Sequence, residues 1–313
     1  MKSRFWAALA GWLWIWGVAS AQTGGEACPP NASYSPEMFA KAAEQARDRG
    51  FLWRIERDGR SSYLYGTLHV GKAEWMSPGP VMRDALRQVD AVALEVDITS
   101  AESQKTLIEI FQRPQRAIHP DLSQRLERLW LSECLPLDRL GIGPVELQAI
   151  GLAGLRGRRQ GFDPGYSSEK MLTGLARGQK MPVFALESVG QQLKLFMADS
   201  DAEAAEAVAS VLTHLEKPQA RLMREKLINA WAKSDMGVLE RYQEWCECVT
   251  TEREQSAMKA LLDDRNPGLA DGIERLHAGG QRVFAAVGAL HMTGPLALQG
   301  LLQAQGFAVT RLF

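Results

Sequence analysis

Two short segments of the sequence end an apolar strand pattern with the same spacing of glycine and histidine. The segment "YLYGTLHVGK" places Gly66 three residues before His69, and "FAAVGALHMT" places Gly288 three residues before His291. A glycine at the end of a strand lets another backbone, a ligand or an ion approach closely. Imidazoles bind divalent transition-metal ions and also transfer protons near neutral pH. The repeated spacing therefore predicts metal binding or acid–base catalysis.

Two glutamates follow apolar runs in a matching way. The tripeptide Ala-Leu-Glu puts Glu95 in the strand pattern of residues 91–97 and Glu187 in that of residues 181–188. Strand ends are where α/β sheets build sites, because the loops there are exposed while the sheet fixes their direction. A single histidine or glutamate of this kind more often has a structural role. Two matched pairs, one in each half of the chain, favour a functional site.

The chemistry of such a set is that of an open metal site or of an acid–base pair. Neutral imidazoles and carboxylates suit Mn²⁺, Co²⁺, Fe²⁺ or Zn²⁺, and an incomplete ligand set keeps a position for a polarised water. The sequence has no H-E-x-x-H, G-x-S-x-G or P-loop motif. His119, His214 and His277 lie in a loop or on helix patterns, and we expect them to be structural.

The elements that must position these residues form an α/β pattern, with strands near both ends of the chain and helices between them. We expect one domain, with a mixed sheet core, two halves related by weak internal symmetry and a large helical insertion. The expected strands are a hairpin over 51–69, then 91–97, 181–188, 282–291 and 307–313; the expected helices are 80–90, 166–179 and 294–306, with helical patterns throughout 100–159 and 189–278.

Charge and the first residues limit location and partners. The chain has 36 basic and 37 acidic residues, so no net field attracts nucleic acid. Lys2 and Arg4 precede an apolar run, and small residues follow it up to Ala21. This pattern predicts a signal peptide over residues 1–21 and a periplasmic or secreted protein with no stable membrane insertion after cleavage. The alternative is an uncleaved anchor, for which the run is short.

The four cysteines belong to an oxidising compartment under this prediction, where an even number favours two disulfides. Cys246 and Cys248 are separated by one residue, and a direct bond between them would be strained. We therefore expect these two to pair with Cys28 and Cys134. Free buried thiols are the alternative.

The order of the motifs resembles the TraB/GumN family, also called TraB/PrgY/GumN, to which the Tiki metalloproteases of animals are related. The similar segments are "WRIERDGRSSYLYGTLHVGK", "GFDPGYSSEKML", "KMPVFALESVGQQL", "LLDDRN" and "VFAAVGALHMTGPLALQGLLQAQGFAVTRL". The resemblance covers residues 45–313 and leaves residues 22–44 as an N-terminal segment. It implies the fold of erythromycin esterase and ChaN-like proteins, with approximate two-fold symmetry between the halves.

The resemblance also implies roles for individual residues. Glu187 and Gln192 match one motif, Asp163 matches a second, and Arg265 and Asn266 match a third. In the Tiki branch, the paired histidines and the first acidic residue are tied to peptide hydrolysis that depends on Mn²⁺ or Co²⁺. The implied metal ligands are His69, Glu95 and His291; the implied catalytic set adds Glu187 and Arg265; the implied substrate-binding residues are Asp163, Gln192 and Asn266.

We therefore expect a periplasmic metallohydrolase, a peptidase that acts on a peptide or protein through a metal-activated water. Arg265 would steady a substrate carboxylate or an oxyanion, or would bridge Asp163. One alternative is a hydrolase that uses the same histidines and glutamates as acid and base without a metal. A second alternative is a non-catalytic binding or sequestering protein of the periplasm. The substrate, the metal and the oligomeric state stay open at this point.

Overall fold

The computed structural model describes residues 28–313, so the expected signal peptide over residues 1–21 lies outside the described part. Its centre is a six-stranded mixed sheet with the order β4-β3-β5-β2-β1-β6. The strands are β1 (Phe51–Arg57), β2 (Arg60–Thr67), β3 (Ala91–Leu94), β4 (Val183–Ala185), β5 (Val283–Gly288) and β6 (Ala308–Arg311). This sheet and its many helices confirm the mixed α/β class; the symmetry between the halves stays a prediction.

The hairpin predicted over residues 51–69 is present as β1 and β2. Its turn consists of Asp58 and Gly59, which both have positive φ values, of 54° and 70°. Such a two-residue turn matches the right-handed twist of the flanking strands. The turn fixes an antiparallel register in which Phe51 lies opposite Gly66. In this register the strand that leads to His69 is buried within the sheet.

Four neighbouring strands of the sheet are parallel. β2 pairs with β5, β5 with β3, and β3 with β4, all in the parallel sense. Their carboxyl ends therefore meet at one edge of the sheet, as in other open α/β sheets. β1 and β6 are antiparallel additions on the far side of β2.

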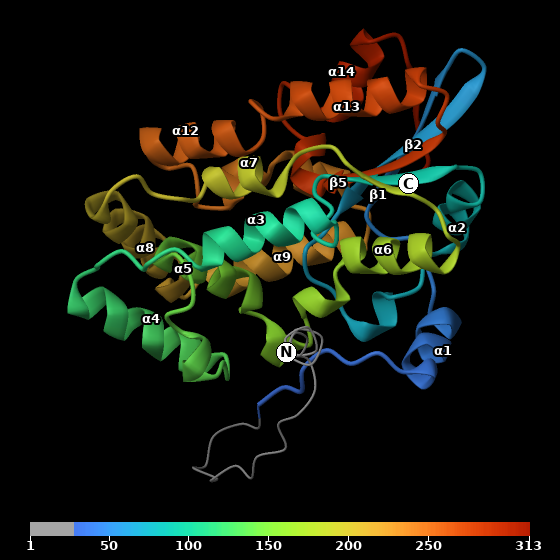
Figure 1. The fold of residues 1–313 in the computed structure, drawn as a ribbon. Coiled ribbons are helices and arrows are strands. Elements are labelled where there is room, and N and C mark those ends of the chain that lie inside the picture. Colours follow the sequence, from blue (N-terminus) through green and yellow to red (C-terminus); the bar gives the residue numbers. More distant parts are fainter. Residues whose placement is uncertain (1–27) are drawn as a thin grey trace, which may run out of the picture.

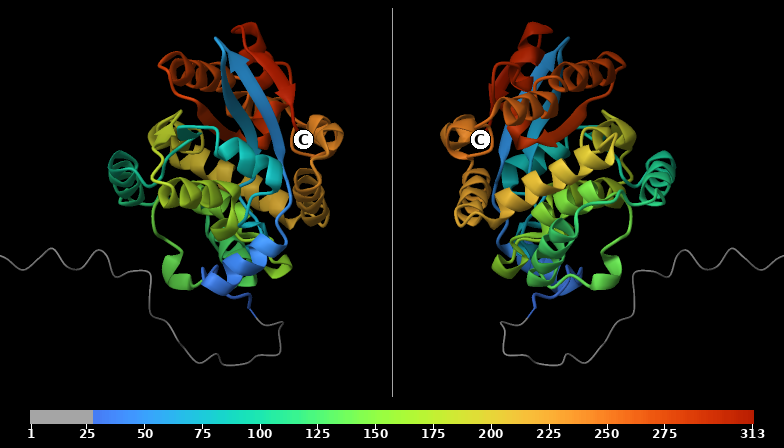
Figure 2. Two further views of the ribbon diagram at one scale, coloured as in Figure 1. Left: turned by 90° about the vertical axis from the view of Figure 1, so that its right-hand side faces the viewer. Right: turned by 90° about the vertical axis from the view of Figure 1, so that its left-hand side faces the viewer.

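The helices cover the sheet and build a second, purely helical part of the molecule (Figure 1). They are α1 (Pro36–Glu44), α2 (Pro80–Leu86), α3 (Ala101–Phe111), α4 (Pro120–Ser132), α5 (Val145–Leu155), α6 (Ser168–Gly178), α7 (Val189–Lys194), α8 (Asp201–Glu216), α9 (Ala220–Ala232), α10 (Met236–Glu240), α11 (Tyr242–Trp245), α12 (Glu252–Leu261), α13 (Asn266–Ala278) and α14 (Leu298–Ala304). The 3₁₀ turns are η1 (Ala73–Trp75), η2 (Leu137–Arg139), η3 (Arg158–Gln160), η4 (Pro164–Tyr166) and η5 (Ala289–Met292). In the side views the blue hairpin runs beside the red C-terminal elements (Figure 2). In the described part, no helix is long and apolar enough to cross a membrane.

Two hydrophobic cores correspond to these two parts. The larger core contains the strands and the helices packed on the sheet, with Phe51, Leu64 and Phe284 fully buried. The smaller core joins α4, α5 and α8, and its fully buried members include Leu152 and Leu212. The helical patterns predicted over 100–159 and 189–278 thus form real helices that bury their own apolar faces. The predicted helix over 80–90 is shorter, because α2 ends at Leu86.

The disulfides correct one prediction. The bonds join Cys28 to Cys134 and Cys246 to Cys248, and no described cysteine is free. We expected Cys246 and Cys248 to pair with the other two because a bond across one residue seemed strained. The intervening Glu247 adopts a φ of 50°, in the left-handed region. This backbone turn brings the two Cα atoms to 5.1 Å, a normal distance for a disulfide.

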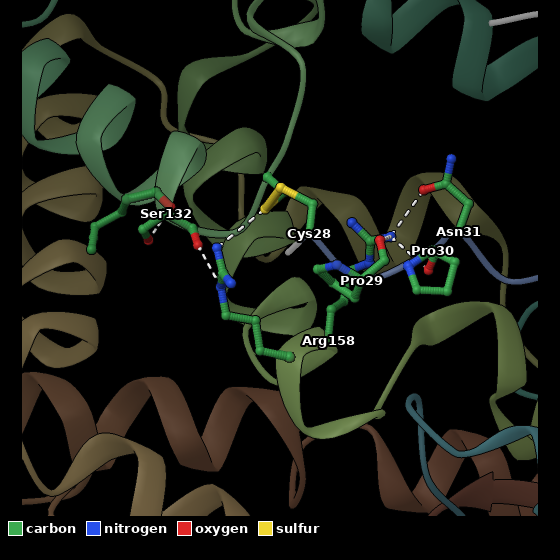
Figure 3. Close-up of a disulfide and its surroundings, with 9 residues drawn as sticks. Cys28, Pro29, Pro30, Asn31, Ser132 and Arg158 are labelled. Atoms are coloured by element: carbon green, nitrogen blue, oxygen red, sulfur yellow. Dashed lines mark hydrogen bonds between the residues drawn. A yellow bond between two sulfur atoms is a disulfide. The ribbon is translucent and has the colours of Figure 1, made fainter. Parts of the chain in front are cut away.

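The Cys28–Cys134 disulfide attaches the first described residues to the segment that follows α4 (Figure 3). The Arg158 guanidinium donates to the Asn31 side chain at 2.9 Å and to the carbonyl of Pro30 at 3.2 Å. The bond to Cys134, and not the expected bond to Cys246 or Cys248, thus anchors Cys28 and the residues that follow it. The anchored segment continues into α1, whose Phe39 lines the main cavity described below.

Candidate functional site

The histidines and glutamates that the sequence analysis singled out lie at one edge of the sheet. Across the four parallel strands, in the order β4, β3, β5 and β2, the residues beyond the strand ends are Glu187, Glu95, His291 and His69. Because neighbouring parallel strands end at the same edge, residues separated by more than two hundred positions come together. The matching Ala-Leu-Glu and G-x-x-H patterns marked this edge correctly.

His291 is a buried, neutral imidazole. Its side chain is almost completely inaccessible, and its Nδ1 lies 2.5 Å from Oδ1 of Asn266. The Asn266 amide nitrogen donates to the carbonyls of His291 and Leu296, so Oδ1 is the acceptor and Nδ1 of His291 is the donor. Burial lowers the pKa of His291 to about 4. Nε2 therefore carries a lone pair at neutral pH and points toward Glu95 Oε1, at 3.7 Å.

His69 has the opposite environment. Its side chain is 75% exposed, and Nδ1 lies 2.8 Å from the Glu169 carboxylate. This carboxylate raises the pKa of His69 above its usual range. Burial would raise the pKa of Glu169, but the His69 imidazole outweighs it and lowers that pKa to about 2. Glu169 therefore orients the ring, leaves Nε2 toward the cavity and favours the protonated form.

Arg265 links the acidic residues on this edge. Its Nε and Nη2 donate to both carboxylate oxygens of Glu187, at 2.7 to 3.2 Å, and Nη2 also donates to Glu95 Oε2 at 2.9 Å. Its Nη1 donates to the carbonyl of Leu261 at 2.9 Å and lies 3.2 Å from Nε2 of His291. A guanidinium has five N–H donors, so this set accounts for all of them. Arg265 therefore joins the residues that follow β3 and β4 through its bonds to Glu95 and Glu187.

Glu95 is the centre of the polar network. Its Oε1 accepts from the backbone N–H of Gly288 at 2.5 Å, and its Oε2 accepts from Gln192 at 3.0 Å as well as from Arg265. Burial alone would raise the pKa of Glu95, but His291, His69 and Arg265 outweigh it and lower the pKa. The side chain is therefore a buried carboxylate that stays ionised.

Two cavities lie on either side of the Glu95–Arg265–Glu187 bridge. The larger, of about 820 Å³, is lined by His69, Glu95, Glu169 and Gln192 together with many apolar side chains. The smaller, of about 510 Å³, is lined by Glu187 and Arg265 together with Asp264, Gln191 of α7 and Arg275 of α13. His69 and Glu95 are thus accessible to a ligand in the larger cavity, whereas Glu187 faces the smaller one.

Gly288 leaves open the space in which the two histidines and Glu95 meet. A Cβ placed on Gly288 would lie 3.0 Å from Glu95 Oε1, 3.6 Å from Cδ2 of His291 and 3.9 Å from Nε2 of His69. Both imidazoles therefore face one small space beside the carboxylate, as the paired motifs predicted. The chemistry of the donors suits a divalent ion, because an outer partner holds Nδ1 of each ring, as is usual for metal-ligating histidines. Asn266 does so for His291 by a hydrogen bond, and Glu169 does so for His69 by an ion pair.

The fit to an ion has one limit. Among residues 28–313, no group of three or more His, Cys, Asp and Glu side chains is placed so that it could hold a metal ion. The Arg265 guanidinium already contacts Glu95 and His291. His69, Glu95 and His291 are the residues that would hold an ion in this space, and the ion would have to displace the Arg265 guanidinium from Glu95 and His291.

The other predicted site residues have different places. Gln192 is in the site, where it contacts Glu95. Asn266 is fully buried behind His291, so it orients that ring and does not reach the cavity. Asp163 pairs with Arg158 at 3.0 Å and not with Arg265, and its backbone forms a bridge with Gly71. Asp163 therefore fixes the loop that follows His69.

Glu169 is the site residue that the sequence analysis missed. It lies in the first turn of α6, where an acidic residue is common and needs no functional explanation. Its segment, "YSSEKML", was part of the resemblance, but nothing in the spacing connects it to a histidine one hundred residues earlier. Only the packing of α6 beside the end of β2 shows this pairing.

Two of the three histidines that we expected to be structural, His277 and His119, have structural contacts. His277 is fully buried between Ser62 Oγ, at 2.9 Å, and the carbonyl of Arg57, at 3.0 Å. His119 caps α4 through Nδ1, which accepts from the backbone of Asp121. Neither lies among the residues that line the two cavities.

Fold and site together define an α/β protein whose polar site lies at the carboxyl edge of its parallel strands. The TraB/PrgY/gumN family model matches residues 51–311, and the chain belongs to this family. It is 23% identical over 236 residues to "Uncharacterized protein YbaP" of Shigella flexneri and, to the same extent, to "Uncharacterized protein YbaP" of Escherichia coli (strain K12). Each alignment covers 75% of this chain and 85% of the relative. No solved structure matches.

Proposed function

We propose that the protein is a periplasmic or secreted hydrolase, a peptidase, that works with a divalent ion held by His69, Glu95 and His291. The observation that carries the proposal is the space beside Gly288, which His69, His291 and the ionised Glu95 carboxylate all face; His69 and Glu95 also line the large cavity. Mn²⁺ or Co²⁺ is the ion that the family resemblance favours, and Zn²⁺ or Fe²⁺ has suitable ligand chemistry.

A bound ion would polarise the scissile carbonyl and lower the pKa of a water in the site. The chain's own residues supply the remaining parts. Asn266 holds His291 so that the Nε2 lone pair faces the site, and Arg265 and Gly288 hold the Glu95 carboxylate. Glu169 lies 2.8 Å from Nδ1 of His69 and so leaves Nε2 of that ring, in its neutral form, as the atom that would contact the ion. The apolar walls of the cavity exclude water around the substrate.

A second candidate is a hydrolase that needs no metal. It is favoured by the contact of Arg265 with Glu95 and His291, which already places a cation where the ion would act. In this version neutral His291 accepts a proton from the attacking water, and protonated His69 donates one to the leaving group. Both candidates use the same cavity, and they differ in their response to a chelator.

The test is hydrolysis of a fluorogenic peptide mixture by the chain from residue 22 onward, after treatment with a chelator and after addition of Mn²⁺, Co²⁺ or Zn²⁺. We expect turnover that requires an added ion and that Glu95→Gln abolishes. Glu146→Gln is the matched control, because Glu146 is also buried and accepts a backbone N–H, from Ala198, but lies outside the site.

Turnover that persists in the chelator and is lost in Glu95→Gln would select the metal-free candidate. If no peptide were hydrolysed under any of these conditions, both hydrolase candidates would be contradicted. The hypothesis of a non-catalytic binding protein would then remain. An equal loss of turnover in Glu146→Gln would show that the loss in Glu95→Gln reports folding and not chemistry.

A further inference from the structure

We infer that the larger cavity takes the carboxyl-terminal end of a peptide, with a bulky apolar side chain and a free carboxylate that Arg177 and Lys170 bind. This inference rests on the proposed function, because it names the substrate class of the same site. It starts from the lining of the cavity and from the charges that the site itself leaves uncompensated.

Most of the cavity wall is apolar. The apolar side chains that line it come from α1, the loop after β2, the end of β3 and α6, and they include Phe39, Met76, Leu94, Met171 and Leu175. A cavity of about 820 Å³ is in the range of typical small-ligand sites. Such walls gain free energy by removing apolar surface of a ligand from water, so they select a bulky apolar group.

The acids that face the cavity are already engaged. Glu95 is held by Arg265, Gln192 and Gly288, and Glu169 is paired with His69. The remaining acid, Asp97, follows β3 and accepts from the backbone and hydroxyl of Thr99. Glu95 and Glu169 are therefore paired with cations, and Asp97 is the one cavity-lining acid of the described residues without a cationic partner.

The two remaining cations are on α6. Lys170 and Arg177 are exposed and line the cavity, and within residues 28–313 neither makes an ion pair or hydrogen bond through its side chain. Residues seven apart lie on the same face of a helix, so the two charges point to the same side of α6. An anionic group in the cavity would meet both of them, and a guanidinium binds a carboxylate through two parallel hydrogen bonds.

The helix also sets the distance between this charge and the chemistry. Glu169, which holds His69, and Arg177 are both on α6, eight residues apart. At about 1.5 Å per residue their Cα atoms are separated by about 12 Å along the helix axis. An extended peptide covers this distance with about three residues. The cavity thus fits a hydrolase that removes a short peptide from the carboxyl end of its substrate.

The experiment measures binding of product-length tripeptides, so that it does not depend on turnover. Ala-Ala-Phe, its carboxamide and Ala-Ala-Ser are titrated calorimetrically into the chain from residue 22 onward in a chelator. The variants are Arg177→Gln and Lys170→Gln. Arg83→Gln is the matched control, because Arg83 is also an exposed arginine in the last turn of its helix but lies away from the cavity.

We expect Ala-Ala-Phe to bind at least tenfold tighter than its carboxamide, and about tenfold tighter than Ala-Ala-Ser. Arg177→Gln should reduce the preference for the free acid to less than threefold, whereas Arg83→Gln should keep it. Equal binding of acid and amide, no binding of Ala-Ala-Phe, or the same loss in Arg83→Gln would overturn the inference. Peptide hydrolysis without any preference for a free carboxylate would overturn it while leaving the proposed function intact.

Discussion

The two strand ends that carry the G-x-x-H motifs are alike in sequence and opposite in environment. His291 is buried, its partner is the neutral amide of Asn266, and burial lowers its pKa. His69 is exposed, its partner is the Glu169 carboxylate, and this charge raises its pKa. Without a bound ion, one motif therefore presents a lone pair and the other a proton. The difference lies in what packs behind each ring, not in the motif itself.

The two glycines differ in the same way. A Cβ on Gly66 would lie 3.2 Å from the Cα of Ala289, so this glycine permits two backbones to pack closely. A Cβ on Gly288 would enter the space between the histidines and Glu95. The first glycine has a packing role and the second keeps the site open.

The largest expected effect is on turnover, and it tests whether both ends belong to one site. His69→Gln and His291→Gln should each lower kcat/KM by about 10²- to 10⁴-fold, because each removes a group that acts on the reacting atoms. The double variant should be little worse than either single variant, since groups that act as a unit are not additive. Fully independent effects of the two substitutions would separate the two ends into different functions.

The next largest effect is on stability and concerns Asn266 and Glu169, the residues that hold the rings of His291 and His69. Asn266→Ala leaves the buried Nδ1–H of His291 and the carbonyls of His291 and Leu296 without this partner, and should cost about 2–5 kcal/mol in the free energy of unfolding. Glu169→Gln removes an ion pair to an exposed ring, which should cost at most about 1 kcal/mol. Chemical denaturation measures both, and equal costs would contradict the contrast in burial.

The glycine pair should separate stability from function. Gly66→Ala forces the backbone near Ala289 to move and should cost about 1–3 kcal/mol of stability, as overpacking does. Gly288→Ala should cost less stability, because the Glu95 side chain can shift, but should remove turnover. The pair is compared by thermal unfolding and by hydrolysis of the same peptide. A fully active Gly288→Ala variant would place the reaction elsewhere.

The smallest expected effects are on the protonation of the two imidazoles as the pH of chelator-treated protein is changed. NMR of the ring protons should show His69 still largely protonated at pH 7, whereas His291 should stay neutral until the pH approaches about 4. The raised pKa of His69 stabilises the fold below the unfolded pKa of about 6.5, and this contribution is lost as pH rises through the folded pKa. The lowered pKa of His291 has the opposite sign, so stability falls as pH decreases from about 6.5 toward 4. Similar titration of both rings would remove the basis of the comparison.

Much of this arrangement could be predicted from the sequence. The hairpin, the strand ends at Glu95 and Glu187 and the shared site of His69 and His291 follow from period-2 patterns and from the rule that parallel strands end at one edge. These features depend on short-range pattern and on topology, and both can be read from the order of the residues.

The rest depends on contacts that no local pattern encodes. The pairing of Glu169 with His69 arises from the packing of α6 against the end of β2. The Cys246–Cys248 bond depends on the left-handed backbone of Glu247, which a non-glycine residue seldom adopts. The contacts of Arg265 with Glu95, Glu187 and His291 require the ends of β3, β4 and β5 to meet, and therefore cannot be derived from its own segment.

The central claim is that the two strand ends form one ion-binding hydrolytic site. The most direct measurement is calorimetric titration of Mn²⁺ into the chelator-treated chain from residue 22 onward, for the wild type and for His69→Ala, His291→Ala, Glu95→Gln and the control Glu146→Gln. The account predicts one ion per chain, at least tenfold weaker binding in each of the three site variants and unchanged binding in the control. No binding to the wild type, or unchanged binding in His69→Ala or His291→Ala, would contradict it.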